Sequence, residues 1–153
     1  MSSLVEKLAR DPVRPQMIND CVDLIDSQVK QKGFVIKSAY ATIKAIKKKF
    51  VPEVVDSMLD EWLEKLQPHF DKWSVAKTQS FTDYVVARGD DVAEDLLAVT
   101  DGRAEKTSHT TAKKMYGRMR EGAKKNVIEA IPALAQMIER HLKAQADQPV
   151  ASV

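Results

Sequence analysis

Apolar residues recur along this chain at steps of three and four positions, and no segment alternates apolar with polar residues. The first such segment, 15–33, has its apolar side chains at Ile18, Cys21, Val22, Ile25 and Val29. Steps of this size place side chains on one face of an α-helix, whereas a half-buried strand requires strict alternation. The pattern therefore predicts an all-α protein, folded as a single compact bundle of about six or seven helices.

Prolines, glycines and capping residues indicate where these helices end. The expected helical segments are 15–33, 35–48, 52–68, 70–88, 90–101 and the region from 108 onward. Pro68 is expected to mark a helix end or a sharp corner, Asp101-Gly102 is expected to end a helix, and Pro132 is expected to kink or restart one. A glycine weakens a helix by about 1 kcal/mol relative to alanine, so a further break is expected near Glu121-Gly122.

The length of the chain suits one domain. Its 153 residues, of which 44 % are hydrophobic, are enough to enclose a single core. We expect an N-terminal segment over residues 1–13, a helical domain over 14–142 and a frayed C-terminal tail over 143–153. Within the domain, the segments 35–48 and 52–66 are expected to pack as a hairpin in the core, around Tyr40, Phe50, Met58 and Trp62.

Nothing in the sequence indicates export or membrane insertion. The N-terminus lacks the apolar run of a signal peptide, and no stretch approaches the ~18 uncharged apolar residues of a membrane span. The single cysteine, Cys21, excludes an intrachain disulfide, and its place on an apolar helix face favours a buried, inert thiol. We expect a cytoplasmic protein without a transmembrane segment.

Charged residues are sorted into blocks along the chain, although the net charge is only +2. Seven lysines and no acidic residue lie between Asp26 and Glu53. Residues 53–101 hold twelve acidic and four basic residues, and residues 103–125 return to a net charge of +6. Since exposed helices usually mix the two signs, the two basic segments are the candidates for binding a partner.

The candidate binding residues are lysines of the segment 35–48 and basic residues of the segment 103–125. They are Lys37, Lys44, Lys48, Lys113, Lys114, Arg118, Arg120, Lys124 and Lys125. If the second segment is one continuous helix, positions 113, 120 and 124 share one strip of its surface, and positions 114, 118 and 125 share the next.

Three interpretations of these basic faces remain open. In the first interpretation, the basic faces are exposed to solvent and bind nothing. In the second, they bind a polyanion, an acidic protein or anionic lipid headgroups. In the third interpretation they pair with the acidic 53–101 segment, either inside the bundle or across a homodimer.

Catalytic and metal-binding patterns are absent from the sequence. It contains no glycine-rich phosphate loop, no H-E-x-x-H and no G-x-S-x-G. The histidines His69, His109 and His141 are far apart and match no metal-ligand spacing. We therefore expect no catalytic residue, metal site or cofactor. The function expected is that of a non-catalytic binding or interaction module whose basic faces engage a polyanionic or acidic partner.

Two alternatives belong to other classes of protein. One is a small-molecule enzyme or carrier with a pocket between its helices, for which Tyr40, Cys21 and Trp73 are candidate lining residues. The other is a homo-oligomeric structural protein. Peripheral attachment of the segment 34–50 to a membrane would require its apolar face to be exposed. We expect that face to be buried; its residues are Ile36, Ala39, Tyr40, Ile43 and Ile46.

Four segments carry a family resemblance. They are RPQMINDCVDLIDSQV (14–29), GFVIKSAYATIKAIKKKFVPEVVD (33–56), VAEDLLAVTDGRAEKTS (92–108) and AKKMYGRMREGAKKNVIEAIPALAQMI (112–138). The run LAVTDGRAEKTS and the pairs Lys113-Lys114 and Lys124-Lys125 are the most distinctive parts. These segments resemble a family of uncharacterised bacterial proteins, and the likeness covers roughly residues 14–142. The resemblance implies a helical fold and brings no assigned activity, cofactor or catalytic residue. The family pattern tends to have proline where this chain has Glu121, which implies a helix boundary there.

Overall fold

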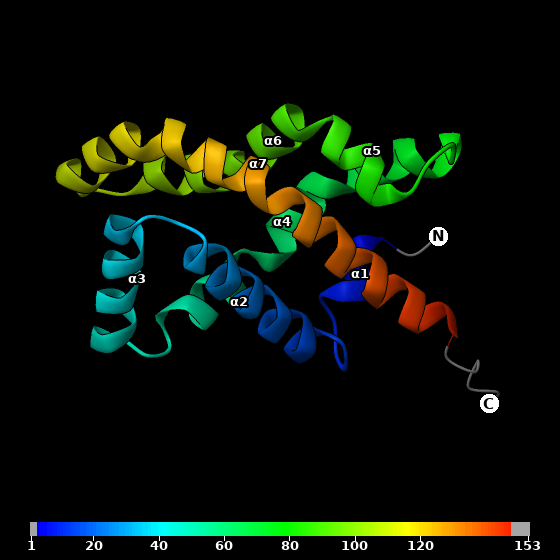
Figure 1. Ribbon diagram of the computed structural model, residues 1–153, viewed down its shortest axis with the longest axis horizontal. Helices are drawn as coiled ribbons and strands as arrows, with labels where there is room; N and C mark the ends of the chain where they lie inside the picture. The colour runs from blue at the N-terminus through cyan, green and yellow to red at the C-terminus, as the bar shows by residue number, and fades with distance from the viewer. Residues whose placement is uncertain (1–2, 148–153) are drawn as a thin grey trace.

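All regular structure in the chain is helical in a computed structural model that describes residues 3–147 (Figure 1). The seven helices are α1 (Leu4–Leu8), α2 (Arg14–Lys30), α3 (Phe34–Ile46), α4 (Phe50–Ala76), α5 (Phe81–Ala87), α6 (Gly89–Lys106) and α7 (Thr110–Asp147). Residues 3–147 contain no strand. The predicted all-α class and the predicted number of helices are both confirmed.

Serine side chains cap the first turns of the two shortest helices. Ser3 Oγ accepts a hydrogen bond from the backbone N–H of Glu6 at 3.1 Å, and Ser80 Oγ accepts one from Asp83 at 3.0 Å. A serine in this position satisfies one of the N–H groups that have no partner inside the helix. These caps define where α1 and α5 begin, although both helices are too short to be stable alone.

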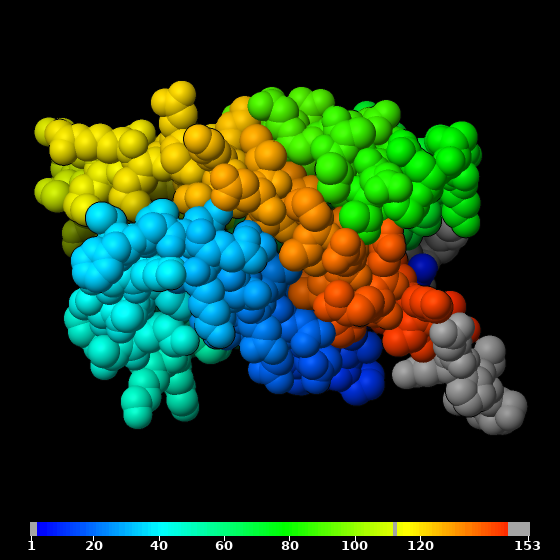
Figure 2. All heavy atoms as spheres, in the orientation of Figure 1, coloured from blue at the N-terminus to red at the C-terminus, as the bar shows by residue number. Residues whose placement is uncertain are grey.

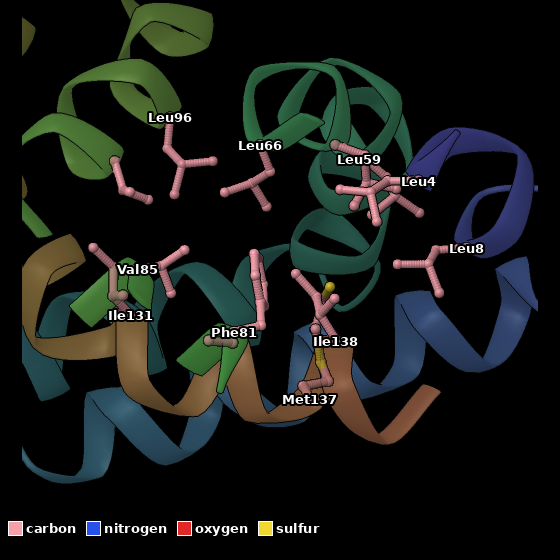
Figure 3. Packing of buried hydrophobic residues seen from close by; sticks show 14 of the residues in the cluster. Leu4, Leu8, Leu59, Leu66, Phe81, Val85, Leu96, Ile131, Met137 and Ile138 are labelled. Atoms are coloured by element: carbon pink, nitrogen blue, oxygen red, sulfur yellow. The ribbon is translucent and has the colours of Figure 1, made fainter. Parts of the chain in front are cut away.

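The core is enclosed between α4 and α7, and α1, α2, α5 and α6 each pack against both of them. Figure 3 shows side chains from α4, α5 and α7 pointing toward one another across this space. Its most deeply buried members are Leu4, Leu8, Met17, Val55, Leu59, Leu63, Phe81, Val92, Ile131, Met137 and Ile138. Each of these helices therefore contributes one apolar stripe to a shared interior, as the periodicity predicts.

Side-chain contacts show that α7 runs antiparallel to both α2 and α6. His141 Nε2 lies 2.6 Å from an Asp20 oxygen, and Glu129 pairs with Lys32 just beyond the end of α2. These two contacts lie twelve residues apart along both segments. On the other flank, rising positions on α7 meet falling positions on α6: Arg120 pairs with Asp101 and Lys124 with Asp90, each at 2.9 Å. α7 therefore connects the two sides of the bundle.

Three predicted helix ends are wrong because the helices continue. α4 runs through Pro68, α6 runs through Asp101-Gly102, and α7 is uninterrupted at Glu121-Gly122. Pro132 also lies inside α7, which changes direction partway along its length in Figure 1. A proline costs a helix one hydrogen bond and bends it, and a glycine costs about 1 kcal/mol. Packing of these helices against their neighbours outweighs such local penalties.

The predicted helical region 70–88 is divided by a turn. α4 ends where Lys77 adopts a left-handed conformation with φ of 42°. Beyond this residue, the indole N–H of Trp73 donates to the carbonyl of Gln79 at 2.7 Å. The chain then enters α5, whose Phe81 packs edge-on against Phe70 and Trp73.

α3 stands apart from the core, which contradicts the expected burial of its apolar face. None of its residues is buried, and it packs against α2 and the start of α4. Ile36 and Ile43 are 40 % and 42 % exposed, and Ile46 is 81 % exposed. The core is formed instead by apolar residues of α1, α2, α4, α5, α6 and α7.

The expected central hairpin of 35–48 and 52–66 does not form. Tyr40, Met58 and Trp62 are only half-buried, and Phe50 is exposed. Residues 1–13, which the sequence pattern separates from the domain, contain α1 with its buried Leu4 and Leu8. In the expected tail, α7 continues to Asp147, and residues 148–153 lie outside the described residues.

Candidate functional site

An exposed apolar surface covers α3 and the first residue of α4. We define this α3 surface by its large exposed side chains, which are Phe34, Val35, Ile36, Ile43, Ile46 and Phe50. Figure 2 shows the segment that carries them, in cyan, at one end of the molecule. Scattered apolar residues are ordinary on a protein surface, but a group of this size on one short segment is typical of an interaction site.

One network of side chains fastens α3 to α2. Tyr40 Oη donates a hydrogen bond to Asp26 Oδ1 at 2.5 Å, and Lys44 Nζ donates to the same oxygen at 3.2 Å. The bond from Tyr40 lowers the pKa of Asp26, while burial raises the pKa of Tyr40. Lys44 also lies 5.3 Å from the centre of the Tyr40 ring. Because Tyr40 and Lys44 turn one side of α3 inward, Val35 and Ile46 on the opposite side face solvent.

The three candidate lysines near α3 divide into one engaged and two available residues. Lys44 is engaged with Asp26, as described. Lys37 and Lys48 are exposed and form no ion pair with any residue of the described part of the chain. Their neighbour Lys47 pairs loosely with Glu53, at 3.5 Å. Lys37 and Lys48 therefore keep their charge available to a partner. The helical spacing puts Lys37 on the side of α3 that carries Lys44, away from Val35 and Ile46.

The strip of α7 that contains Arg120 and Lys124 is occupied by α6. Arg120 donates to both carboxylate oxygens of Asp101 at 2.9 Å and to Glu94 at 2.8 Å. Lys124 pairs with Asp90 and Glu94, each at 2.9 Å. These hydrogen bonds raise the pKa of Arg120 and lower the pKa of Asp101. Two of the nine candidate residues thus pair with the acidic segment inside the bundle, which is one of the interpretations stated above.

The other strip of α7 points away from α6. Lys114, Arg118 and Lys125 are exposed and form no ion pair within residues 3–147, and the same holds for Lys113 at the start of the helix. Continuity of α7 keeps Lys114, Arg118 and Lys125 on one side, as the helical spacing predicts. This strip is a second positive surface, without the apolar density found at α3.

Acid is expected to lower the thermal stability of the protein through its paired carboxylates. A hydrogen bond from Arg14 lowers the pKa of Asp60, and a hydrogen bond from Arg120 lowers the pKa of Asp101. A carboxylate of this kind contributes stability that is complete above its pKa in the unfolded chain, about 3.9, and is lost as pH falls through the folded value. We expect the melting temperature, measured by circular dichroism, to decrease once the pH is lowered below about 4.

The variant Asp101→Asn isolates one of these carboxylates. An asparagine at this position cannot be protonated in this range of pH. The melting midpoint of the variant should therefore fall less than that of the wild type between pH 5 and pH 3, roughly the range in which an aspartate titrates. An identical acid-induced fall in the two proteins would show that Asp101 has the same pKa in the folded and unfolded states.

Candidate pocket residues are only partly brought together. Cys21 lines an apolar cavity of about 240 Å³ between α2, α4, α6 and α7, whereas Tyr40 and Trp73 do not. Burial raises the pKa of the Cys21 thiol to about 12, so the thiolate that nucleophilic chemistry needs is scarce at neutral pH.

His69 and His141 each contact one aspartate: His69 lies 2.6 Å from Asp95, and His141 lies 2.6 Å from Asp20. No group of three metal-ligating side chains converges within the described residues.

Phe34 and Val35 belong to the site but were not among its predicted residues. Both lie at the first turn of α3, off the face formed by the three- and four-residue steps. The signal for them was the spread of apolar residues around most of the helix circumference, since a helix packed on one side needs only one stripe.

No helix of the described part of the chain combines the length and apolar character needed to cross a bilayer.

Comparison with known protein families identifies the family of this chain. A family model described as "Family of unknown function (DUF6918)" matches residues 4–142, from the first residue of α1 into α7. No curated protein and no solved structure matches the chain. The resemblance to a family without an assigned function is confirmed by this match. Because the match covers most of the sequence, the chain belongs to this family of unknown function, DUF6918.

Proposed function

We propose that this protein is a non-catalytic binding module that docks through its α3 surface on an anionic phospholipid bilayer. The observation that carries the proposal is the exposure of α3: Phe34, Val35 and Ile46 are 82 %, 79 % and 81 % exposed. An amphipathic helix binds at a membrane interface by placing such side chains among the lipid tails. Full burial of side chains of this size contributes about 2 kcal/mol each.

The charge around α3 favours an anionic surface. No acidic residue occurs between Asp26 and Glu53, and Lys37 and Lys48 have no ion-pair partner within the described residues. A lysine close to an anionic bilayer contributes about 1 kcal/mol. The lysine stems are long enough to lie against apolar surface while the ammonium groups reach the phosphates. Apolar insertion and electrostatic attraction therefore act on the same segment.

Other partners explain less of this surface. Duplex DNA or RNA would leave Phe34, Val35 and Ile46 without apolar contacts, and sequence readout favours arginine over lysine. A two-fold interface between two α3 surfaces would place the lysines of both copies near one another, at an electrostatic cost. We place the docking at the cytoplasmic face of a membrane, where the anionic lipids give a negative surface potential.

Vesicle cosedimentation tests the proposal. The wild-type protein should sediment with phosphatidylglycerol vesicles, should sediment less as salt is added, and should stay in the supernatant with phosphatidylcholine vesicles. Val35→Ser together with Ile46→Ser should weaken partitioning by about a thousandfold, because two apolar side chains are lost from the lipid phase. Lys37→Gln together with Lys48→Gln should weaken it by about thirtyfold at low salt.

Val75→Ser is the matched control for the apolar variant. Val75 is 89 % exposed in the last turn of α4, about 40 Å of helix away from Phe50. Its replacement should leave partitioning unchanged. The proposal fails if the wild type does not bind anionic vesicles, or if the Val75 variant loses as much binding as the α3 variant. Fluorescence polarisation with duplex DNA and heparin supplies the rival outcome: strong binding there without vesicle binding would assign the lysines to a soluble polyanion.

A further inference from the structure

The apolar cavity between α2, α4, α6 and α7 has a volume of about 240 Å³. Leucine, isoleucine, valine, methionine, alanine and tryptophan side chains form nearly all of its wall, and no charged side chain lines it. The polar groups in the wall are the Thr100 hydroxyl and the protonated thiol of Cys21. Native cores keep few voids larger than a water molecule, and an apolar pocket of this kind accepts apolar molecules.

The wall of the cavity is elongated along two antiparallel helices. Its α2 side runs from Met17 to Ile25 and its α7 side from Val127 to Ile138. At 1.5 Å per residue these stretches are about 12 Å and about 16 Å long. The contacts Asp20–His141 and Lys32–Glu129 hold α2 and α7 side by side over this length. A long space of this kind fits an extended chain better than a compact ring.

The two ends of the cavity differ in polarity. Met17 and Ile138 close one end with buried apolar side chains. Thr100 lies toward the opposite end, because α6 is antiparallel to α7 and Thr100 is the lining residue of α6 nearest to the Arg120–Asp101 pair. Its hydroxyl lies 2.8 Å from that of Tyr116. The Tyr116 hydroxyl in turn donates to Asp101. The Thr100 hydroxyl also donates to the carbonyl of Leu97 at 2.9 Å, so it offers a polar end group a hydrogen-bond acceptor at this second end.

We infer that this cavity binds an unbranched alkyl chain of about ten non-hydrogen atoms, with the polar end of the chain at Thr100. A cavity of about 150 Å³ holds benzene, and the same ratio of volume to atoms gives about ten for 240 Å³. The chain belongs either to a free medium-chain amphiphile or to the tail of a phospholipid. The inference does not rest on membrane docking, since none of the residues of the α3 surface lines the cavity.

Tryptophan fluorescence provides a direct test, because Trp62 lines the cavity and Trp73 does not. In the variant Trp73→Phe, Trp62 is the single remaining tryptophan, so the tryptophan emission reports on the cavity alone. Bromo-substituted octanoic acid, whose bromine quenches tryptophan on contact, should quench Trp62 saturably and raise the melting midpoint of the protein. Absence of saturable quenching up to millimolar ligand would overturn the inference. Circular dichroism establishes that each variant is folded.

A pair of substitutions on α7 places the ligand. Ala130 lines the cavity, so Ala130→Leu adds side-chain atoms that displace about two methylene groups of the ligand and weakens binding by at least about tenfold. Ala144 is exposed, lies farther along the same helix and does not line the cavity, so Ala144→Leu should leave the affinity unchanged. Quenching that persists at full affinity in Ala130→Leu would put the bromine outside the cavity and contradict the inference.

Phospholipid vesicles with brominated acyl chains separate the two sources of the chain. Quenching by these vesicles that Ala130→Leu removes identifies a lipid tail as the occupant. Quenching by the free acid and not by the vesicles identifies a soluble amphiphile. Since the Val35→Ser and Ile46→Ser variant keeps the cavity intact, its response to the free acid should equal that of the wild type even if vesicle docking is lost.

Discussion

Replacing Leu8 with alanine should lower the free energy of unfolding by about 2–5 kcal/mol, as other large-to-small changes in buried positions do. Leu8 is 0 % exposed, and α1 packs against both α4 and α7. For a chain of this length, each kcal/mol lowers the melting midpoint by about 2–4 °C. We therefore expect a fall of roughly 5–20 °C in a thermal melt followed by circular dichroism.

Two hydrogen bonds fix α1 to the bundle, which explains why a helix of five residues should contribute so much to stability. The backbone N–H of Leu4 donates to the side chain of Gln67 on α4 at 2.7 Å, and Gln145 on α7 donates to the carbonyl of Lys7 at 2.8 Å. α1 is thus held at both ends of its backbone while Leu4 and Leu8 fill the core.

Val75→Ala, at an exposed position, is the control and should change stability by no more than about 0.5 kcal/mol. A melting midpoint for Leu8→Ala equal to that of the control would mean that residues 1–13 are a separate segment, as their sequence pattern suggests.

Hydrogen exchange should be at least about a thousandfold faster for amides in the middle of α3 than for those around Leu59 and Leu63 in α4. α3 buries none of its residues, whereas Leu59 and Leu63 are each 2 % exposed. Amides in a helix with little buried surface exchange through local opening, while those in the core exchange only on global unfolding. A difference of about 4 kcal/mol between these opening free energies corresponds to about a thousandfold in rate.

Mass spectrometry of peptides from the two helices measures this difference. Anionic vesicles should slow the exchange of α3 without changing that of α4, because docking stabilises only the segment in contact with lipid. Equal protection of α3 and α4 in the free protein would contradict exposure of α3 and would point to a second copy of the chain covering it. In that case the protection should decrease on dilution, as expected of self-association.

The sequence predicts helices well and their ends poorly, for a physical reason. The steps of three and four positions report which residues share a face, and the predicted segment 35–48 falls within two residues of α3. Pro68 and Asp101-Gly102 carry the local chemistry of helix ends, yet both lie inside helices. Local penalties of about 1–3 kcal/mol are outweighed by packing contacts with residues distant in sequence, and single-sequence patterns contain no measure of those contacts.

Periodicity also cannot say what an apolar face packs against. The faces of α3 and α4 look alike in sequence, but Leu59 of α4 is buried and Ile46 of α3 is exposed. α1 is missing from the expected helices because five residues are too few to show a period, even though Leu4 and Leu8 stand four positions apart. The sequence therefore pointed to α3 through its lysines, while the exposure of its apolar side chains, which were expected to be buried, is seen only in the fold.

Charge sorting predicted the partners of some basic residues and not of others. Pairing between residues 103–125 and the acidic segment 53–101 is one of the three sequence-based interpretations, and Arg120 and Lys124 pair with that segment. Lys114 and Lys124 lie on different sides of α7, and the sequence alone could not separate the residues that face α6 from those that face solvent.

The position of α7 in the bundle has a consequence for biosynthesis. Ile131 and Ile138, which help to close the core, leave the ribosome well after α1 to α6. At roughly 5–20 residues per second, these partners are synthesised about 4–14 s after the leucines of α4. A nascent chain in this interval exposes much of its future interior, so its fate depends on the rate of translation and on the chaperones that meet it.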